Sequence, residues 1–476
     1  TVLSEVQALA DSFANAASIA ENAMCTPQSA LFASSNASAS LMAVFGGNTG
    51  TTQYLDQAIW LVDVYGLLVL DFMVQMSKFT DAESKDECFV DVYADGLAIH
   101  KWIVDRDSAP EQEYLSSTPV SMPLIGLVQL MQLMVLYKTL GVSPGELAIA
   151  TGHSQGIVSA VFLSTLTDDE ESFISGSKKA LGLLMLVGAL PHLALPYFRL
   201  FEHGSNGLAS STNVQATPMV SVQGLNKQQL SKIIDDFNCK QPSANHFVQL
   251  AVANTVDQII VAGQIEQAAK FARFAKSQSA AADQDQSKLL LALCKPVINI
   301  DYLGMTMPYH CDLLQDSAED IVDIALQKGW TFDASDMQIA VRSNDNGHDI
   351  CSESDLTRYL IESVCILPVD WPYAVNAPSI THAVYFGFDG LHGFAQFTYN
   401  NIEGRGIPVI CAGVSAKNSR LPYLGTNVDL YCSNLANVTT APNWLADFGP
   451  KLVCLASNNA VHINTKMHRI FGMPTV

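Results

Sequence analysis

Residues 147–156 read LAIATGHSQG, and this stretch decides the fold class. Its first five residues are small or apolar, which is typical of a short strand buried on both faces. Gly152 and Gly156 allow a sharp turn, and the apolar run from Ile157 predicts a helix. Strand, tight turn and helix in this order predict an α/β fold with a mainly parallel sheet. Such a turn lifts the Ser154 hydroxyl clear of the sheet, so Ser154 is the candidate nucleophile.

Other segments extend this unit in both directions along the chain. Residues 41–45 form a short apolar run that predicts a second strand, and two glycines follow it. Helices are predicted over residues 56–76, 123–140 and 180–198, and a further strand over 382–387. Polar residues or prolines interrupt the two most apolar helices, so we expect buried core helices and no membrane partner.

Residues 217–300 follow a different order of elements. Strands are predicted over 219–222, 247–253, 258–262 and 296–300, and helices over 227–237 and 267–275. This β-α-β-β-α-β order is the ferredoxin-like pattern. We therefore divide the chain into a helical flank (1–40), an α/β catalytic core (41–216 and 301–393), an inserted ferredoxin-like subdomain (217–300) and a C-terminal segment (394–476).

Composition excludes several classes of partner. The net charge of −21, from 46 acidic and 25 basic residues, argues against nucleic acid and anionic membranes, because both bind clustered cations. The ten cysteines contain no Cys-x-x-Cys pair, so we expect reduced thiols, no metal site and a cytoplasmic protein. The chain begins at Thr1 without a basic and apolar leader, so we expect no signal peptide and a piece excised from a longer polypeptide.

A serine hydroxyl needs a base, because it is a poor nucleophile on its own. His310 follows the last predicted strand of the insert, which returns the chain to the core, so its ring could face Ser154 from a loop at the sheet edge. His153 is adjacent to the nucleophile, and we expect a packing or turn role for it. The free N–H groups and positive dipole end of the helix after Ser154 would face any oxyanion formed there.

These residues resemble the starter acyltransferase (acetyltransferase) domain of fungal-type multifunctional fatty acid synthases, the β-subunit type. The similarity covers the chain from about residue 29 to its C-terminus. The segments that resemble the family are residues 29–32, 43–47, 121–130, 140–147, 152–160, 307–310 and 386–387.

The resemblance implies an α/β-hydrolase-like core and a Ser–His dyad. Ser154 would take an acyl group from acyl-CoA as an ester and pass it to the phosphopantetheine thiol of an acyl carrier protein, with His310 as base and acid. Backbone carbonyls, not a carboxylate, would hold the imidazole, and no cofactor is expected in this fragment. The oxyanion hole would use the N–H of Gln155 and a backbone N–H near Asn48, which stands where the family typically has Gln.

Acyl preference depends on the helix beyond the serine. Malonyl-specific relatives carry an arginine there, because a carboxylate in a dry pocket needs a bidentate cation. Residues 183–190 contain no basic residue, and Gly188 or a neighbour takes that place. We therefore predict that Gly188 belongs to an acyl pocket for acetyl or another neutral acyl group.

The C-terminal segment also resembles part of a synthase. Residues 443–452 and 465–474 are similar to the linker that precedes the flavin-dependent enoyl reductase barrel. The expected partners are therefore acyl-CoA, an acyl carrier protein and the other synthase domains, with enoyl reductase next in the chain. Three alternatives stay open: a serine thioesterase or hydrolase, a long-chain loading or unloading acyltransferase of a polyunsaturated fatty acid synthase, and a catalytically degenerate scaffold domain.

Overall fold

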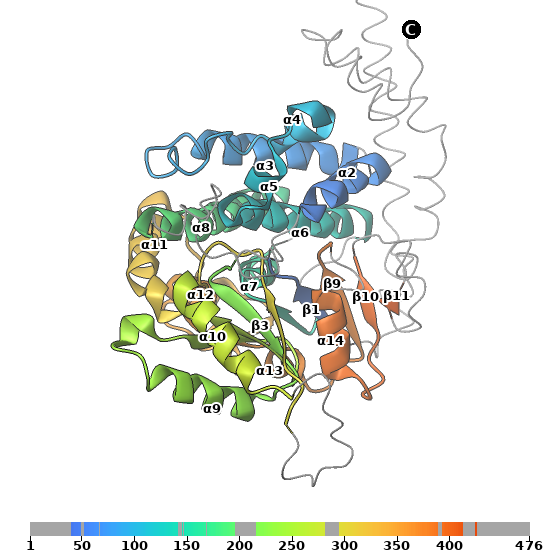
Figure 1. The fold of residues 1–476 in the computed structure, drawn as a ribbon. Helices are drawn as coiled ribbons and strands as arrows, with labels where there is room; N and C mark the ends of the chain where they lie inside the picture. Colours follow the sequence, from blue (N-terminus) through green and yellow to red (C-terminus); the bar gives the residue numbers. More distant parts are fainter. Residues whose placement is uncertain are drawn as a thin grey trace, which may run out of the picture.

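The structure of the chain is a computed structural model, shown in Figure 1. It describes residues 40–48, 52–65, 67–140, 145, 147–167, 169–195, 216–280, 295–388, 393–412 and 424–425. The predicted helical flank lies outside the described residues except for Ser40. Most of the predicted C-terminal segment also lies outside them, including both stretches that resemble the linker before enoyl reductase.

The first sheet has six strands, all parallel, in the order β11-β10-β9-β1-β2-β7. All five residues of the central strand β1 are buried. Parallel pairing places the carboxyl ends of all these strands at one edge of the sheet. The prediction of an α/β core with a mainly parallel sheet is confirmed. The strands are β1 (Leu41–Phe45), β2 (Ile149–Gly152), β7 (Ala340–Arg342), β9 (His382–Phe386), β10 (Val409–Cys411) and β11 (Leu424–Gly425).

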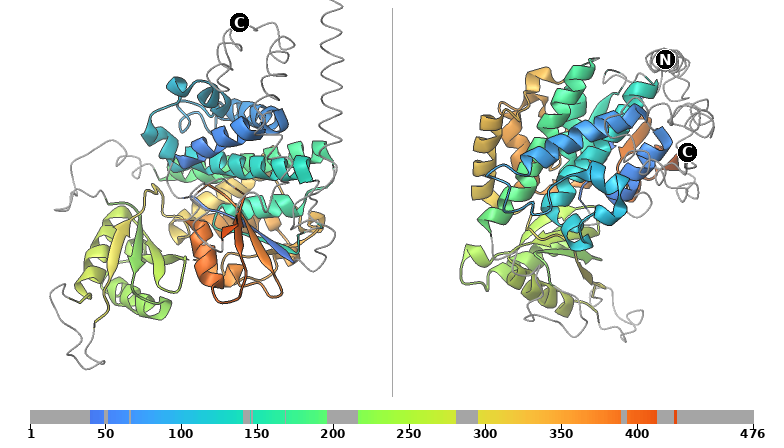
Figure 2. Two further views of the ribbon diagram at one scale, coloured as in Figure 1. Left: turned by 90° about the vertical axis from the view of Figure 1, so that its right-hand side faces the viewer. Right: turned by 90° about the horizontal axis from the view of Figure 1, so that it is seen from above.

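Helices cover this sheet in layers, with α6 and α8 packed against each other and α2 and α3 on their outer side (Figures 1 and 2). The single helix predicted over 56–76 is two helices, and the helix-disfavouring Gly66 stands between them in the sequence. The helices of the core are α2 (Gln53–Tyr65), α3 (Leu67–Glu83), α4 (Ile99–Val104), α5 (Gln112–Ser116), α6 (Thr118–Leu140), α7 (Gly156–Ser164), α8 (Glu170–Ala194), α11 (Gln315–Lys328), α12 (Leu356–Cys365), α13 (Trp371–Val375) and α14 (Phe394–Ile402). Single 3₁₀ turns span Arg106–Ser108, Ala244–His246, Asp312–Leu314, Ala334–Asp336 and Ile350–Ser352.

Helices α6 and α8 are long and apolar enough to cross a membrane by length and composition alone. However, 94% of the apolar window of α6 and 72% of that of α8 are buried inside the protein. Asp169 caps α8, accepting hydrogen bonds from the backbone N–H groups of Glu171 and Ser172. Both helices are therefore core helices, as their sequences predicted.

The second sheet has five strands in the order β6-β3-β5-β4-β8. The elements from β3 to β6 follow the predicted β-α-β-β-α-β order, and their neighbouring strands are antiparallel. The fifth strand, β8, comes from the core region and pairs in parallel with β4. These elements are β3 (Met219–Gln223), α9 (Lys227–Asn238), β4 (Gln249–Ala253), β5 (Gln258–Ala262), α10 (Ile265–Ser277), β6 (Asn299–Tyr302) and β8 (Val369–Asp370).

The predicted end of the core at residue 393 is wrong. Strand β10 pairs in parallel with β9, and the backbone N–H of Ala412 donates to the carbonyl of Tyr385. Helix α14 lies between β9 and β10 and buries Phe394 and Ile402. The core therefore continues at least to Ala412. Without β10, the backbone groups along one edge of β9 would be unpaired.

Candidate active site

Ser154 occupies a sharp turn between β2 and α7. Its φ angle of 52° lies in the left-handed region, which is strained for a residue with a side chain. The turn is tight, since a Cβ added to Gly152 would overlap the backbone of Gly156. The N–H of His153 donates to the carbonyl of Phe45 at 2.8 Å and ties the turn to β1. This geometry presents the Ser154 hydroxyl at the carboxyl edge of the parallel sheet, as predicted.

His310 meets Ser154 directly. Its Nε2 lies 2.8 Å from Ser154 Oγ, and its Nδ1 lies 2.8 Å from the carbonyl oxygen of Leu367. A carbonyl only accepts, so Nδ1 carries the proton and Nε2 is free to accept from the serine. Burial lowers the pKa of His310 to about 4, although the carbonyls of Leu367 and Ser363 favour its charged form. The ring is therefore a neutral acceptor at neutral pH.

Asn344 links the two sides of this pair. Its Nδ2 donates to the backbone carbonyl of Ser154 at 3.4 Å and to Ser363 Oγ at 3.1 Å. Ser363 lies in α12, close to the carbonyls that surround His310. Asn344 was not among the predicted residues, although a polar side chain just after a parallel strand was an available signal.

The loop after β1 lies against the start of α7. We name residues 46–48 the oxyanion loop. The Nε2 of Gln129 donates to the carbonyl of Gly46 at 2.7 Å, and Asn48 Nδ2 donates to Ser121 Oγ at 2.8 Å. The side chain of Gln155 is also held by α6, since its Nε2 donates to the carbonyl of Met122 at 3.2 Å. Helix α6 thus fixes both predicted oxyanion residues, Asn48 and Gln155.

Gly188 lies where α8 packs on the start of α6. A Cβ at this position would meet Pro119 Cα at 3.1 Å and Pro119 O at 3.2 Å, so a larger side chain has little room. One turn further along, the His192 ring lies 3.1 Å from the carbonyl of Gly188 and 2.7 Å from Thr306 Oγ1. The place of Gly188 in an acyl pocket stays a prediction.

His153 is buried beside the nucleophile. Its ring packs against Trp371 and Phe394, with ring centroids 5.0 Å and 4.2 Å away. Its Nε2 lies 2.8 Å from Oδ1 of Asn254, a residue of the inserted sheet. Burial lowers the pKa of His153 to about 3, so its ring is neutral at neutral pH.

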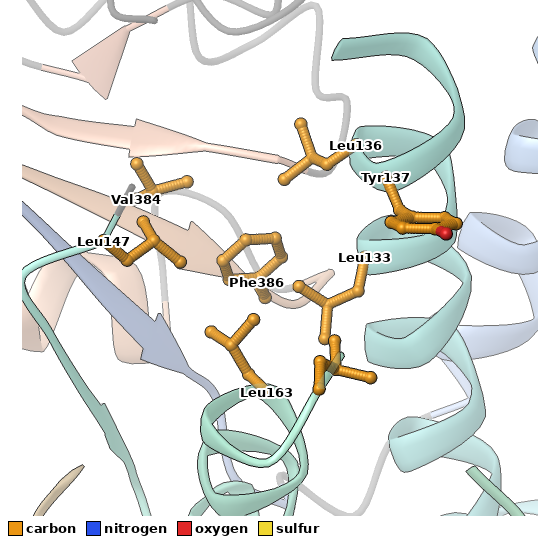
Figure 3. A pocket seen from close by; sticks show the side chains of 8 residues that line it. Leu133, Leu136, Tyr137, Leu147, Leu163, Val384 and Phe386 are labelled. Atoms are coloured by element: carbon orange, nitrogen blue, oxygen red, sulfur yellow. The ribbon is translucent and has the colours of Figure 1, made fainter. Parts of the chain in front are cut away.

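Two cavities lie away from Ser154. A cavity of about 20 Å³ between α6, α7 and β9 is lined by apolar side chains such as Leu133, Leu163 and Phe386 (Figure 3). It has room for about one water molecule and few polar groups to hold one. A more open pocket of about 440 Å³ lies between α3 and α4.

In the part of the chain that the structure describes, no three His, Cys, Asp or Glu side chains gather as metal ligands.

The parallel sheet, the serine turn with its histidine and the ferredoxin-like insert define a class of α/β proteins built around an elbow serine. A model of the family described as "Starter unit:ACP transacylase in aflatoxin biosynthesis" matches residues 44–293, more than half of the chain. The chain belongs to this starter unit:ACP transacylase family.

Two curated relatives support the resemblance stated above. The fatty acid synthase subunit beta of Saccharomyces cerevisiae is 30% identical over 463 residues, covering 94% of this chain and 22% of that protein. The subunit beta of Schizosaccharomyces pombe is 30% identical over 443 residues, covering 92% and 21%. The chain thus spans about a fifth of the length of these relatives. The resemblance to the fungal β-subunit domain is confirmed.

A solved structure shares the fold. The acyl-carrier-protein S-malonyltransferase of Burkholderia pseudomallei matches with a TM-score of 0.53 at 15% identity, covering 80% of this chain and 98% of that one. The expectation that backbone carbonyls hold the His310 ring did not name Leu367, and sequence reasoning missed Asn344 and Asn254. A backbone carbonyl has no signal in a sequence, and Asn254 looked like an ordinary turn residue.

Proposed function

We propose that this protein is an acyltransferase that moves an acetyl or other neutral acyl group from acyl-CoA to the phosphopantetheine thiol of an acyl carrier protein. The observation that carries the proposal is the 2.8 Å contact of Ser154 Oγ with His310 Nε2 at a strained strand-to-helix turn. The family, described as starter unit:ACP transacylase, and the fatty acid synthase relatives support the same reaction class.

The reaction has two half-reactions that use the same pair of residues. In the first, Ser154 Oγ attacks the thioester carbonyl while His310 Nε2 takes the hydroxyl proton. The C–S bond then breaks, the CoA sulfur receives that proton, and Ser154 holds the acyl group as an ester. In the second, the carrier thiol gives its proton to His310 and attacks the ester, and Ser154 Oγ leaves and regains the proton.

Charge develops on the substrate carbonyl oxygen in both half-reactions. The backbone N–H of Gln155, at the start of α7, and that of Asn48 are the donors we assign to this oxyanion. Their side chains are held by Met122 and Ser121 of α6, so donor positions are set before substrate binds. The carbonyls of Leu367 and Ser363 face the imidazolium that His310 forms transiently.

The acyl group is assigned as neutral. A carboxylate in a buried site needs a paired cation, and residues 183–190 provide none. A side chain at Gly188 would also be tightly confined, since its Cβ would lie 3.1 Å from Pro119 Cα. A serine hydrolase of the α/β-hydrolase type would orient its histidine with a carboxylate, whereas Nδ1 of His310 faces a carbonyl.

Intact-protein mass spectrometry tests the proposal. Wild type and Ser154→Ala are incubated with acetyl-, malonyl- or palmitoyl-CoA, and then with a carrier protein. An acetyl adduct that is absent from Ser154→Ala and moves to the carrier supports it. A malonyl adduct contradicts the neutral pocket, and a palmitoyl adduct without an acetyl adduct favours long-chain loading. Release of free CoA without transfer favours hydrolysis, and no reaction at all favours a scaffold.

A further inference from the structure

We propose that Asn254, acting through the ring of His153, positions the oxyanion loop and so controls how well the site stabilises an oxyanion. Asn254 lies in the β4–β5 turn of the insert, whereas His153 and the loop follow strands of the parallel sheet. The inference rests on the proposed function of Ser154 and adds a positioning residue to it.

Asn254 is fixed on two sides before it reaches His153. Its N–H donates to the carbonyl of Gln258 at 3.0 Å, which closes the turn between β4 and β5. Its own carbonyl accepts from Nδ2 of Asn401, in helix α14 of the core, at 2.7 Å. The side chain is buried, and Oδ1 lies 2.8 Å from His153 Nε2. The amide is therefore a rigid contact from the insert to the elbow.

This contact decides the tautomer of His153. The amide oxygen only accepts, so Nε2 carries the proton and Nδ1 has a bare lone pair. Nδ1 is buried and has no hydrogen-bond partner in the described part of the chain. A buried acceptor without a partner costs free energy, so this ring is not optimised for stability alone.

The ring lies beside Gly47 of the oxyanion loop and leaves no room for a side chain there. A Cβ added to Gly47 would lie 2.8 Å from His153 Nδ1 and 2.9 Å from His153 O. Gly47 precedes Asn48, the candidate oxyanion donor. Asn254, Trp371 and Phe394 also contact this ring, so its position sets the space available beside Gly47. Oxyanion donors must be placed to within a few tenths of an ångström, so this contact bears on catalysis.

An amide at position 254, rather than a carboxylate, is also consistent with this role of Asn254. His153 and His310 repel each other electrostatically when both are charged. A carboxylate at position 254 would favour a charged His153, which would oppose the imidazolium that His310 must form. Asn254 supplies the acceptor oxygen without that charge.

The test compares two ligands on the full chain. A trifluoromethyl ketone analogue of acyl-CoA reacts with an elbow serine to form an oxyanion, whereas a thioether analogue binds without one. Replacing Asn254 by Leu should weaken the ketone analogue about tenfold to a hundredfold and leave the thioether affinity unchanged. Asn254→Asp keeps the acceptor oxygen but favours a charged His153, so it should also weaken the ketone analogue, because that charge opposes the imidazolium of His310.

Asn238→Leu is the matched control, because Asn238 bonds both backbone groups of Val248 within the same subdomain and does not touch the elbow. It should lower the melting temperature and leave both affinities unchanged. Equal weakening of both analogues by Asn254→Leu, no weakening, or the same selective loss in Asn238→Leu would overturn the proposal. If Ser154→Ala binds the ketone as well as wild type does, the proposed function of Ser154 itself fails.

Discussion

The two sheets contribute to the active site in different ways. The parallel sheet contributes strand ends: Ser154 follows β2, and the oxyanion loop follows β1. The inserted sheet contributes connections: Asn254 lies in its β4–β5 turn, and the chain that leaves β6 reaches His310. In the proposed function, one sheet would place the nucleophile and the oxyanion donors, and the other would place the base and the side chain that orients His153.

The strands of the two sheets also differ in burial. Every residue of β1 is buried, whereas Asn299 and Asp301 of the edge strand β6 are exposed. A strand that is buried on both faces tolerates little change in volume, and an edge strand tolerates more. We therefore expect changes at the parallel sheet to affect folding, and changes in the connections of the inserted sheet to affect the chemistry.

The largest expected effect is on the chemistry. His310→Ala removes the base and should slow acylation of Ser154 by about 10²–10⁴-fold, measured by rapid quench and intact mass. Circular dichroism checks that the variant stays folded, because the change removes a buried ring that contacts Ser154 and the Leu367 carbonyl. His246→Ala is the control, since His246 is a partly buried residue of the insert whose Nδ1 lies 2.9 Å from Ser243 Oγ. More than a tenth of the wild-type rate in His310→Ala would rule out His310 as the base.

The next effect is on folding and contrasts a glycine beside the parallel sheet, at the start of α7, with one just after β5 of the inserted sheet. A Cβ at Gly156 would lie 2.5 Å from Phe45 O and 2.7 Å from Gly46 O, and neither backbone group can move aside. Gly156→Ala should cost about 1–3 kcal/mol of the free energy of unfolding. Gly263, after β5, is less confined, with its nearest contact at 3.0 Å to a Val248 methyl group. If Gly263→Ala is equally destabilising in urea titrations, the two sheets do not differ in the way we infer.

A smaller effect is expected at the oxyanion loop. Asn48→Gln restores the residue that the fungal family typically has and lengthens the side chain that donates to Ser121. If the backbone N–H is the donor to the oxyanion, kcat should change by less than about tenfold, the effect of one altered hydrogen bond. A change of a hundredfold or more would show that the side chain itself contacts the oxyanion.

The same contrast explains how much could be predicted from the sequence. Periodicity and paired glycines predicted β1, the Ser154 turn and the β-α-β-β-α-β order, because those signals are local. Strand β8 is two residues long, too short for any periodicity, and exists because the longer strand β4 offers its edge. The contact of Asn254 with His153 and that of Leu367 with His310 join segments that meet only in the folded chain. No local sequence pattern predicts them.

The smallest effect is the pH dependence of the base. With a pKa of about 4, His310 is neutral above pH 5, so kcat/KM should be flat from pH 5 to 8 and halved near pH 4. The pKa of His310 is about 4 in the folded protein and about 6.5 in the unfolded chain. Stability should therefore fall as pH drops from 6.5 to 4, because the unfolded state binds more protons in this window.

His310→Ala separates this contribution from those of other groups. Without the ring, the slope of unfolding free energy against pH between 6.5 and 4 should be smaller by about one proton, or about 1.4 kcal/mol per pH unit. An inflection of kcat/KM near pH 6.5, with equal slopes in His310→Ala and wild type, would mean that water reaches His310. The inserted sheet would then position the base without burying it.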